Sequence, residues 1–411
     1  MSGDHRHDGL VSTELGAPGQ PVLRWASRAR SVAEVGHELD RIWSSVSLIT
    51  TDAEGAEERR VAARSSVMNL VVVSGRSEIG ERAASIVEGL SGRHPSRALV
   101  VCQSDPDGPA WLDAQIHAHC VLPAAGAPET CSELVYLTAG GQAGQHLAGV
   151  VAPLLVHDLP VAIWWPSEPR LDSAQVRDLL ALADRVMVDG SGWSGDGLQR
   201  LAQLAELPRR FKLQVTDFAL VRQARWREAI ASTFDRPALL PYLSGLRSIQ
   251  VRYAARDEAP GRTNLVKPLY HVAWLASRLG LAIERPLRID DRAAGYRTTL
   301  RSRSRRVAVV MRPAEDPAPP GTTLAVDLRC ERRASALEID VTAEAEGVVV
   351  RAVVDGEAMP VRRFHAHRQR ESDLLAQTLD EAGLDRVGAA ALAAAAELAE
   401  GVTQVGPGRA R

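Results

Sequence analysis

The sequence predicts an α/β N-terminal domain with a mixed, largely parallel sheet and flanking helices, followed by an α+β C-terminal domain with an antiparallel meander. Residues 66–102 read as an apolar strand, a helix and a second apolar strand, which is the βαβ order of parallel pairing. Residues 295–356 instead alternate apolar and polar side chains in strands joined by short turns, as antiparallel hairpins do. At 411 residues the chain is also too long for one ordinary core, so two domains are expected.

The first domain is expected over residues 31–210, after a disordered tail at residues 1–30. The stretch SVAEVGHELDRIWSSV places its apolar residues on one helical face, and Ser31 with Glu34 fits a capping box at its start. Apolar strands are predicted in SVMNLVVV and in RALVVC, with a helix at about 77–90 between them.

A half-exposed strand follows in WLDAQIHAHCVL, because apolar residues alternate with polar ones. His117 and His119 share its polar face, where a solvated surface is favoured over a metal site since no carboxylate at useful spacing completes a ligand set. Cys120 and Cys131 flank the turn LPAAGAPE between this strand and the strand CSELVYL. They would approach each other if the strands pair, as a redox-sensitive disulfide, but buried reduced cysteines are the favoured interpretation.

A helix is predicted at about 142–156, and it leads into the stretch PLLVHDLPVAIWWPSEPR. Pro160 starts a buried strand in which Trp164 and Trp165 must point to opposite faces. Both rings can be core, one in each layer, but they stand at the carboxyl end of the strand, where α/β domains build their sites. The exit loop through Arg170 is therefore the expected functional surface of this stretch.

The rest of the first domain consists of a helix, the strand RVMVDG and another helix. The glycine-rich stretch VDGSGWSGDG follows this strand, so it could cradle a phosphate. It matches neither GxGxxG nor a P-loop, and an ordinary strand-to-helix loop is favoured.

The second domain is expected over residues 211–405, before a disordered tail at 406–411. It should open with a long helix at 216–235 that has Asp217 as its N-cap, and a later helix should end at Gly280. Five strands of the meander and two closing helices follow. One strand carries several arginines on one face, which suits phosphate or carboxylate partners, although a solvated face is favoured; these are Arg297, Arg301, Arg303 and Arg305.

Several classes of function are disfavoured. A net charge of −2 argues against a nucleic-acid binder, and no run approaches the roughly 20 apolar residues of a membrane span. The 4 cysteines form no CxxC pair, and the N-terminal stretch has no apolar core like that of a signal peptide, so a cytoplasmic protein is expected. No GxSxG elbow, paired carboxylates or metal-ligand spacing is recognisable, so no catalysis, cofactor or metal is predicted.

Characteristic blocks occur in order between about residues 60 and 285: NLVVV, HPSRALVV, the start CSE of the next strand, LVHDLPVAIWW, DFALVRQARWREAIASTFDRP and HVAWLASRLGL. This ordered set resembles the glucose-6-phosphate dehydrogenase assembly protein family, OpcA. The resemblance implies a non-catalytic accessory protein that binds glucose-6-phosphate dehydrogenase and promotes its assembly and activation. It thereby implies support for the oxidative pentose phosphate pathway and the NADPH supply.

An alternative function is a sugar-phosphate-binding α/β enzyme or a metabolite or redox sensor, which the glycine-rich loop, the arginines and the cysteine pair motivate. It differs from the accessory function in requiring a small ligand on the isolated chain. For the accessory function, tryptophan and arginine are the residue types that most often anchor interfaces. The candidate contacts to the dehydrogenase are Asp158, Trp164, Trp165, Arg170, Arg222, Trp226 and Arg227.

Overall fold

A computed structural model of the chain forms two compact units, each assembled from separate segments. It describes residues 9–12, 19–45, 47–51, 57–61, 65–105, 107–122, 130–256, 261–290, 295–302, 305–381 and 383–403. The first unit comprises Met1–Val188, Phe211–Gln214 and Glu371–Ala382, and the second comprises Asp189–Arg210, Val215–Arg370 and Gly383–Arg411. The predicted tail at 406–411 and Arg303 lie outside the described residues.

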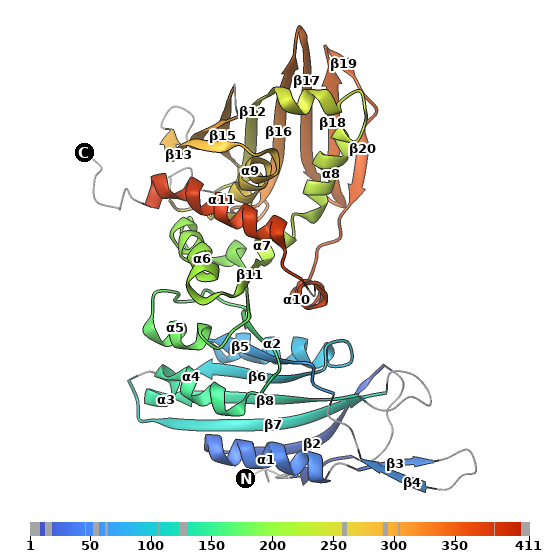
Figure 1. Cartoon of the computed structure of the whole chain (residues 1–411), viewed down its shortest axis with the longest axis vertical. Helices are drawn as coiled ribbons and strands as arrows, with labels where there is room; N and C mark the ends of the chain where they lie inside the picture. Colours follow the sequence, from blue (N-terminus) through green and yellow to red (C-terminus); the bar gives the residue numbers. More distant parts are fainter. Residues whose placement is uncertain are drawn as a thin grey trace. The chain divides into compact units, whose positions relative to one another are not determined.

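The first unit is built on a mixed sheet (Figure 1). Its strands are β1 (Gly9–Leu10), β2 (Pro21–Ala29), β5 (Met68–Ser74), β6 (Ser96–Gln103), β7 (Trp111–Val121), β8 (Thr130–Gly140), β9 (Val161–Trp165) and β10 (Arg185–Val188), and the small pair β3 (Ser47–Thr51) and β4 (Glu57–Val61) lies apart. Its helices are α1 (Val32–Ser45), α2 (Ser77–Gly89), α3 (Gly141–Gln145), α4 (Leu147–Val151), α5 (Ala174–Leu180) and α10 (Glu371–Asp380).

The sheet order is β1-β2-β7-β8-β6-β5-β9-β10-β11, where β11 is Gln214–Asp217. Neighbours from β8 to β10 run parallel, whereas β7 runs antiparallel to both β8 and β2. The central strands are mostly apolar, with Val71, Leu99 and Ile163 fully buried, as is typical of strands covered on both faces. The predicted α/β class with a mixed, largely parallel sheet is confirmed.

The structure corrects the prediction of a disordered tail at residues 1–30, because β2 forms over Pro21–Ala29 and pairs with β7. Trp25 is only 2% exposed, and its indole donates to the Ser27 hydroxyl. Trp25, Ser27 and Ala29 are buried at every second position of this strand, but the polar residues among them give no clear apolar alternation in the sequence. The helix expected at about 142–156 is also interrupted, since it breaks at His146 between α3 and α4.

Cys120 and Cys131 lie directly opposite each other on β7 and β8 and are joined by a disulfide. This corrects the favoured interpretation of reduced cysteines. The physical reason is the register of the two strands, which the sequence does not determine. In this register the two buried cysteines are direct cross-strand neighbours. Among the described residues, Cys102 and Cys330 are free and buried.

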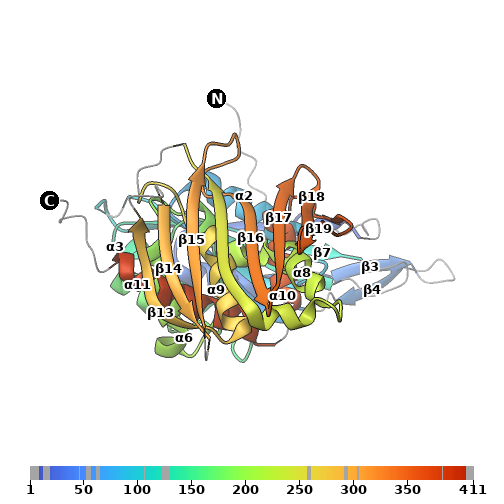
Figure 2. The same cartoon turned by 90° about the horizontal axis from the view of Figure 1, so that it is seen from above.

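The second unit is a mostly antiparallel sheet covered by helices (Figure 2). Its strands are β12 (Leu246–Ala254), β13 (Ala282–Asp290), β14 (Gly295–Arg301), β15 (Arg306–Ala314), β16 (Thr323–Arg332), β17 (Ser335–Glu344), β18 (Gly347–Val354), β19 (Glu357–Ala358) and β20 (Arg362–His365). Its helices are α6 (Leu198–Phe211), α7 (Phe218–Val221), α8 (Ala224–Phe234), α9 (Val266–Leu279) and α11 (Arg386–Thr403).

The meander of this unit is not continuous. In the order β13-β14-β15-β12-β16-β17-β18-β19, the earlier strand β12 is inserted between β15 and β16 and runs parallel to β15. Helix α9 packs on β12 and β16, and α11 packs on α9 and β13. Along β17, buried Leu337, Ile339 and Val341 alternate with polar residues that point to the uncovered face of the sheet. The predicted α+β class with an antiparallel sheet is confirmed.

Candidate functional site

The paired tryptophans of the first unit are core residues. Trp164 is 0% and Trp165 is 3% exposed, and because they point to opposite faces of β9, both faces of that strand are buried. Asp158 and Arg170 are exposed, but they flank β9 at its two opposite ends. Asp158 also takes a left-handed conformation, with φ of 65°, in the turn before the strand. The structure does not gather these four candidates into one surface.

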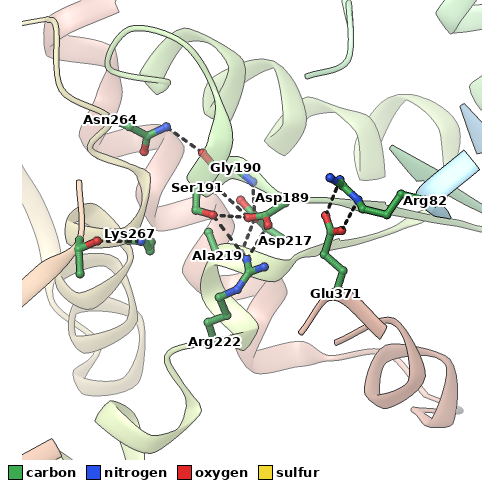
Figure 3. Close-up of polar contacts among 11 residues, drawn as sticks. Arg82, Asp189, Gly190, Ser191, Asp217, Ala219, Arg222, Asn264, Lys267 and Glu371 are labelled. Atoms are coloured by element: carbon green, nitrogen blue, oxygen red, sulfur yellow. Dashed lines mark hydrogen bonds and ion pairs between the residues drawn. The ribbon is translucent and has the colours of Figure 1, made fainter. Parts of the chain in front are cut away.

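In the second unit, a polar network surrounds the glycine-rich loop (Figure 3). Asp189 follows β10 and accepts hydrogen bonds from the backbone N–H and the hydroxyl of Ser191, at 3.2 and 2.5 Å. The Arg222 guanidinium donates to the other carboxylate oxygen of Asp189 at 2.6 Å. Arg222 is available for this bond because the expected helix at 216–235 breaks at Arg222 and Gln223, between α7 and α8.

Asp217 lies at the centre of the network and is 4% exposed. Its carboxylate accepts from the backbone N–H groups of Gly190 and Ala219 at 2.9 and 2.8 Å, and from the Tyr270 hydroxyl at 2.9 Å. The bond from Ala219 makes Asp217 the N-cap of α7, as the sequence predicts. Burial, with a smaller contribution from the charge of Asp189, raises the pKa of Asp217 to about 7.

Gly190 is required in this loop because of close packing. A Cβ at this position would lie 2.6 Å from a carboxylate oxygen of Asp217 and 2.9 Å from Val266 Cγ1. We expect Gly190→Ala to lower the free energy of unfolding by about 1–3 kcal/mol, as overpacking does. Urea unfolding followed by tryptophan fluorescence measures the loss. Gly192→Ala is the matched control, since its Cβ would have no neighbour within 4 Å; equal losses in the two variants would contradict the packing role.

Asn264 connects the glycine-rich loop to the start of α9 through hydrogen bonds. Its amide group donates to the carbonyl oxygens of Gly190 and Trp193 at 2.9 and 3.0 Å, and its carbonyl oxygen accepts from the N–H of Val266 at 3.0 Å. The network therefore holds the strand-to-helix loop, α7 and α9 in one arrangement. An ordinary strand-to-helix loop was the favoured interpretation of VDGSGWSGDG, and within it Gly190 and Gly197 allow close packing against Val266.

Three further polar residues line the contact between α8 and α9. The Gln223 amide donates to the carbonyl oxygen of Lys267 at 2.6 Å, and the Trp226 ring lies 5.1 Å from the fully buried His271 ring. Burial, followed by the charges of Arg227 and Lys267, lowers the pKa of His271 to about 3. Burial, followed by the charge of Arg222, lowers the pKa of Lys267.

The structure thus brings Arg222, Trp226 and Arg227 into one region of the second unit. Arg222 and Trp226 take part in the contacts above, and Arg227 donates to the carbonyl oxygen of Leu220 at 2.5 Å. Sequence reasoning missed Lys267 and His271. One signal could have found Lys267: it is one of two lysines, with Lys212, in a chain whose other basic side chains are arginines.

Within the described ranges, no group of three or more His, Cys, Asp or Glu residues could hold a metal ion. No helix in that part of the chain is both long and apolar enough to cross a bilayer.

Fold and network together define a two-unit protein in which a mixed α/β sheet precedes a helix-covered antiparallel sheet with a buried polar loop anchor. Two family models match this layout in sequence: the glucose-6-phosphate dehydrogenase subunit N-terminal domain over residues 87–206 and the corresponding C-terminal domain over residues 213–392. The chain belongs to the OpcA family of glucose-6-phosphate dehydrogenase assembly proteins, as its ordered sequence blocks predict.

Curated relatives include the OxPP cycle proteins OpcA of Synechocystis sp. and of Nostoc punctiforme, each 26% identical over 199 residues. These alignments cover 48% and 47% of this chain, but only 39% and 40% of the two relatives. The chain therefore spans about two fifths of the length of the curated relatives it matches.

Similar solved structures include an oxidoreductase from Bacillus subtilis, with a TM-score of 0.45 and 8% identity over 82% of this chain and 98% of that chain. Another is the 3-ketoreductase KijD10 of Actinomadura kijaniata, with a TM-score of 0.44 and 15% identity over 81% of this chain and 96% of that one. Likeness at this level carries no information about activity.

Proposed function

We propose that this chain is a non-catalytic accessory protein that binds glucose-6-phosphate dehydrogenase in the cytoplasm and promotes its assembly and activation. Through that enzyme it supports the oxidative pentose phosphate pathway and the NADPH supply. The observation that carries the proposal is the match of two successive models of a dehydrogenase subunit, which together extend from residue 87 to residue 392.

An accessory protein of this kind acts by differential affinity. It can raise the activity of the dehydrogenase only if it binds the active form more tightly than the inactive form. A tenfold shift toward the active form requires about 1.4 kcal/mol of difference between the two binding free energies. A modest interface on a preformed surface is sufficient for that.

The proposed contacts divide by exposure. Asp158 and Arg170 present exposed side chains, and Arg222, Trp226 and Arg227 are part exposed. Trp164 and Trp165 are buried, so we assign them the role of supporting the loop that carries Arg170. Arg170 is therefore the residue of the first unit for which charge reversal tests the interface most directly.

The test uses the full chain and the purified dehydrogenase of the same organism. NADP⁺ reduction is measured across glucose 6-phosphate concentrations with and without the chain, and the mass of any complex is measured by sedimentation. We expect a stable complex and a higher rate at low substrate. Arg170→Glu should weaken the complex, whereas Arg329→Glu, on the exposed strand position of β16, should not. An unchanged rate curve together with separate sedimentation would refute the proposal.

A further inference from the structure

The sheet of the second unit has an outer face, on which the side chains are exposed or half-exposed. Along β12 and β14 to β17 these side chains alternate with buried ones, and the buried set lies under α8 and α9, which contact the sheet. The strand registers arrange the outer side chains in rows. The central row crosses β14, β15, β12, β16, β17 and β18 in turn and consists of Arg297, Val310, Gln250, Asp327, Asp340 and Arg351.

The charges on the outer face are divided between its two halves. Within their described residues, β14 and β15 contribute arginines to this face and no acidic side chain; these are Arg297, Arg301, Arg306 and Arg312. β16 and β17 contribute mainly acidic side chains, with Arg329 as the exception; these are Asp327, Glu331, Glu338, Asp340 and Glu344. β12 separates the halves and contributes the uncharged Ser248 and Gln250, together with Arg252.

Like charges are cross-strand neighbours within this face. Side chains directly opposite each other on paired strands are close enough to interact, and like charges in such positions destabilise a sheet. An oppositely charged surface laid on the face would offset that cost. The like-charged neighbours are Arg301 with Arg306, Arg252 with Arg312, and Asp327 with Asp340.

Contacts within the chain neutralise these charges only in part. Arg252 lies 3.7 Å from Asp327 and 3.9 Å from Asp340, which is beyond hydrogen-bond distance. Closer pairs lie at the margins of the face, and most of their side chains are exposed, so each contributes little stability. Arg301, Arg312 and Asp340 belong to none of these marginal pairs, which are Arg297 with Asp290, Arg306 with Glu284, Arg247 with Glu331 and Arg351 with Glu344.

We propose that the outer face binds the outer face of a second copy of this chain, with β12 at the centre and the two-fold axis parallel to the strands. Such an axis exchanges the two sides of β12, so the arginine half of each copy lies on the acidic half of the other. The contact then occurs twice, and like-charged neighbours in one copy meet opposite charges in the other. The uncharged Ser248, Gln250 and Val310 lie near the axis, as fits an interface with its charges toward the rim.

The size of the outer face is comparable with that of a stable interface. Neighbouring strands are about 4.8 Å apart, and each residue advances a strand by about 3.4 Å. From β14 to β18 the face is therefore about 25 Å wide and about 25 Å long, a footprint of roughly 600 Å². Side chains raise the accessible area above the footprint, toward the roughly 800 Å² that each partner buries in a typical stable complex.

Sedimentation equilibrium of the isolated full chain tests this contact, with the charges of each half reversed in turn. We expect the native chain to be a dimer at about 10 μM. Its dissociation constant should rise with salt, because salt screens the charges. Two double variants, Arg301→Glu with Arg312→Glu and Asp327→Lys with Glu338→Lys, should each raise the dissociation constant at least about tenfold.

Mixing the two double variants gives the sharpest comparison. The first keeps its acidic half and the second keeps its arginine half, so one of the two contacts can form between them. An equal mixture should therefore form heterodimers at concentrations where each variant alone is a monomer. Arg301→Glu, Arg312→Glu and Asp327→Lys each turn a like-charged neighbour pair into an oppositely charged one, so the monomers should keep the native melting temperature, which is measured alongside.

A native chain that stays monomeric up to about 100 μM would overturn the proposal. Native-like dimers of either double variant, or a mixture that stays monomeric, would do the same. If the chain alone is a monomer and the reversals weaken only its complex with the dehydrogenase, the outer face binds that enzyme and the second copy is the wrong partner. Because sedimentation uses the chain alone, its result is separate from that of the rate measurements with the dehydrogenase.

Discussion

Replacing Glu133 by alanine is expected to lower the free energy of unfolding of the first unit by about 3–5 kcal/mol. The Glu133 side chain is 0% exposed and pairs with Arg97 on the neighbouring parallel strand through two hydrogen bonds, of 2.5 and 2.9 Å. The Trp43 indole also donates to this carboxylate, and Arg97 donates to the carbonyl oxygen of Leu154 at 3.0 Å. Removing the carboxylate leaves a buried guanidinium without its counter-charge, which is why the expected loss is large.

A double substitution separates the charge from the packing. The pair Arg97→Met and Glu133→Leu removes both charges and fills a similar volume, so the double variant should be more stable than Glu133→Ala alone. Urea unfolding of the single and double variants, followed by a probe in the first unit, completes the cycle. If the double variant loses as much free energy of unfolding as the two single variants lose together, Arg97 and Glu133 are not energetically coupled. The explanation by charge pairing is then wrong.

Asp217→Asn should remove a pH dependence of the free energy of unfolding of roughly 4 kcal/mol. The pKa of Asp217 is about 7 in the folded chain and 3.8 in the unfolded chain. Each unit of this difference corresponds to about 1.4 kcal/mol. The folded chain holds this proton more tightly than the unfolded chain. The contribution is therefore fully present below pH 3.8 and is lost as the pH rises through about 7. Asparagine keeps the acceptor for the N–H groups of Gly190 and Ala219, and its amide can donate to the Tyr270 oxygen.

The measurement is the melting temperature of both proteins from acidic to slightly alkaline pH. The difference between the two curves isolates Asp217, since His271 is present in both proteins and its low pKa favours the fold at higher pH. The melting temperature of the Asp217→Asn variant should rise relative to that of the native chain as the pH rises. Asp158→Asn removes an exposed carboxyl and serves as the control for net charge. A difference curve that is flat across this range would show that Asp217 ionises as freely in the fold as outside it.

Local patterns predicted a large part of the fold. The apolar runs of β5, β6 and β9 predict parallel strands, Asp217 caps α7, and Gly280 ends α9 with a left-handed φ of 61°. These features depend on neighbours in sequence, so the sequence contains their signal. The blocks that resemble the OpcA family are equally local, and the family models confirm the family that these blocks indicate.

Features that depend on distant segments were not predicted. The insertion of β12 between β15 and β16 is a choice among pairings that local alternation does not rank. The disulfide depends on the register of β7 and β8, across a turn whose length permits more than one register. The proximity of Gln223, Lys267 and His271 depends on how α8 packs on α9, and it explains why the site in the second unit was found only in part.

The return of α10 to the first unit has a consequence for synthesis on the ribosome. Glu371 pairs with Arg82 at 3.1 Å, Asp380 pairs with Arg93, and the carbonyl oxygen of Thr378 accepts from Arg185 at 2.5 Å. About 180 residues are translated between the end of β10 and the start of that helix, which takes on the order of ten seconds or more. During this time the surface of the nascent first unit that α10 later covers is exposed to solvent. A chaperone that binds this surface during translation should therefore raise the yield of folded protein.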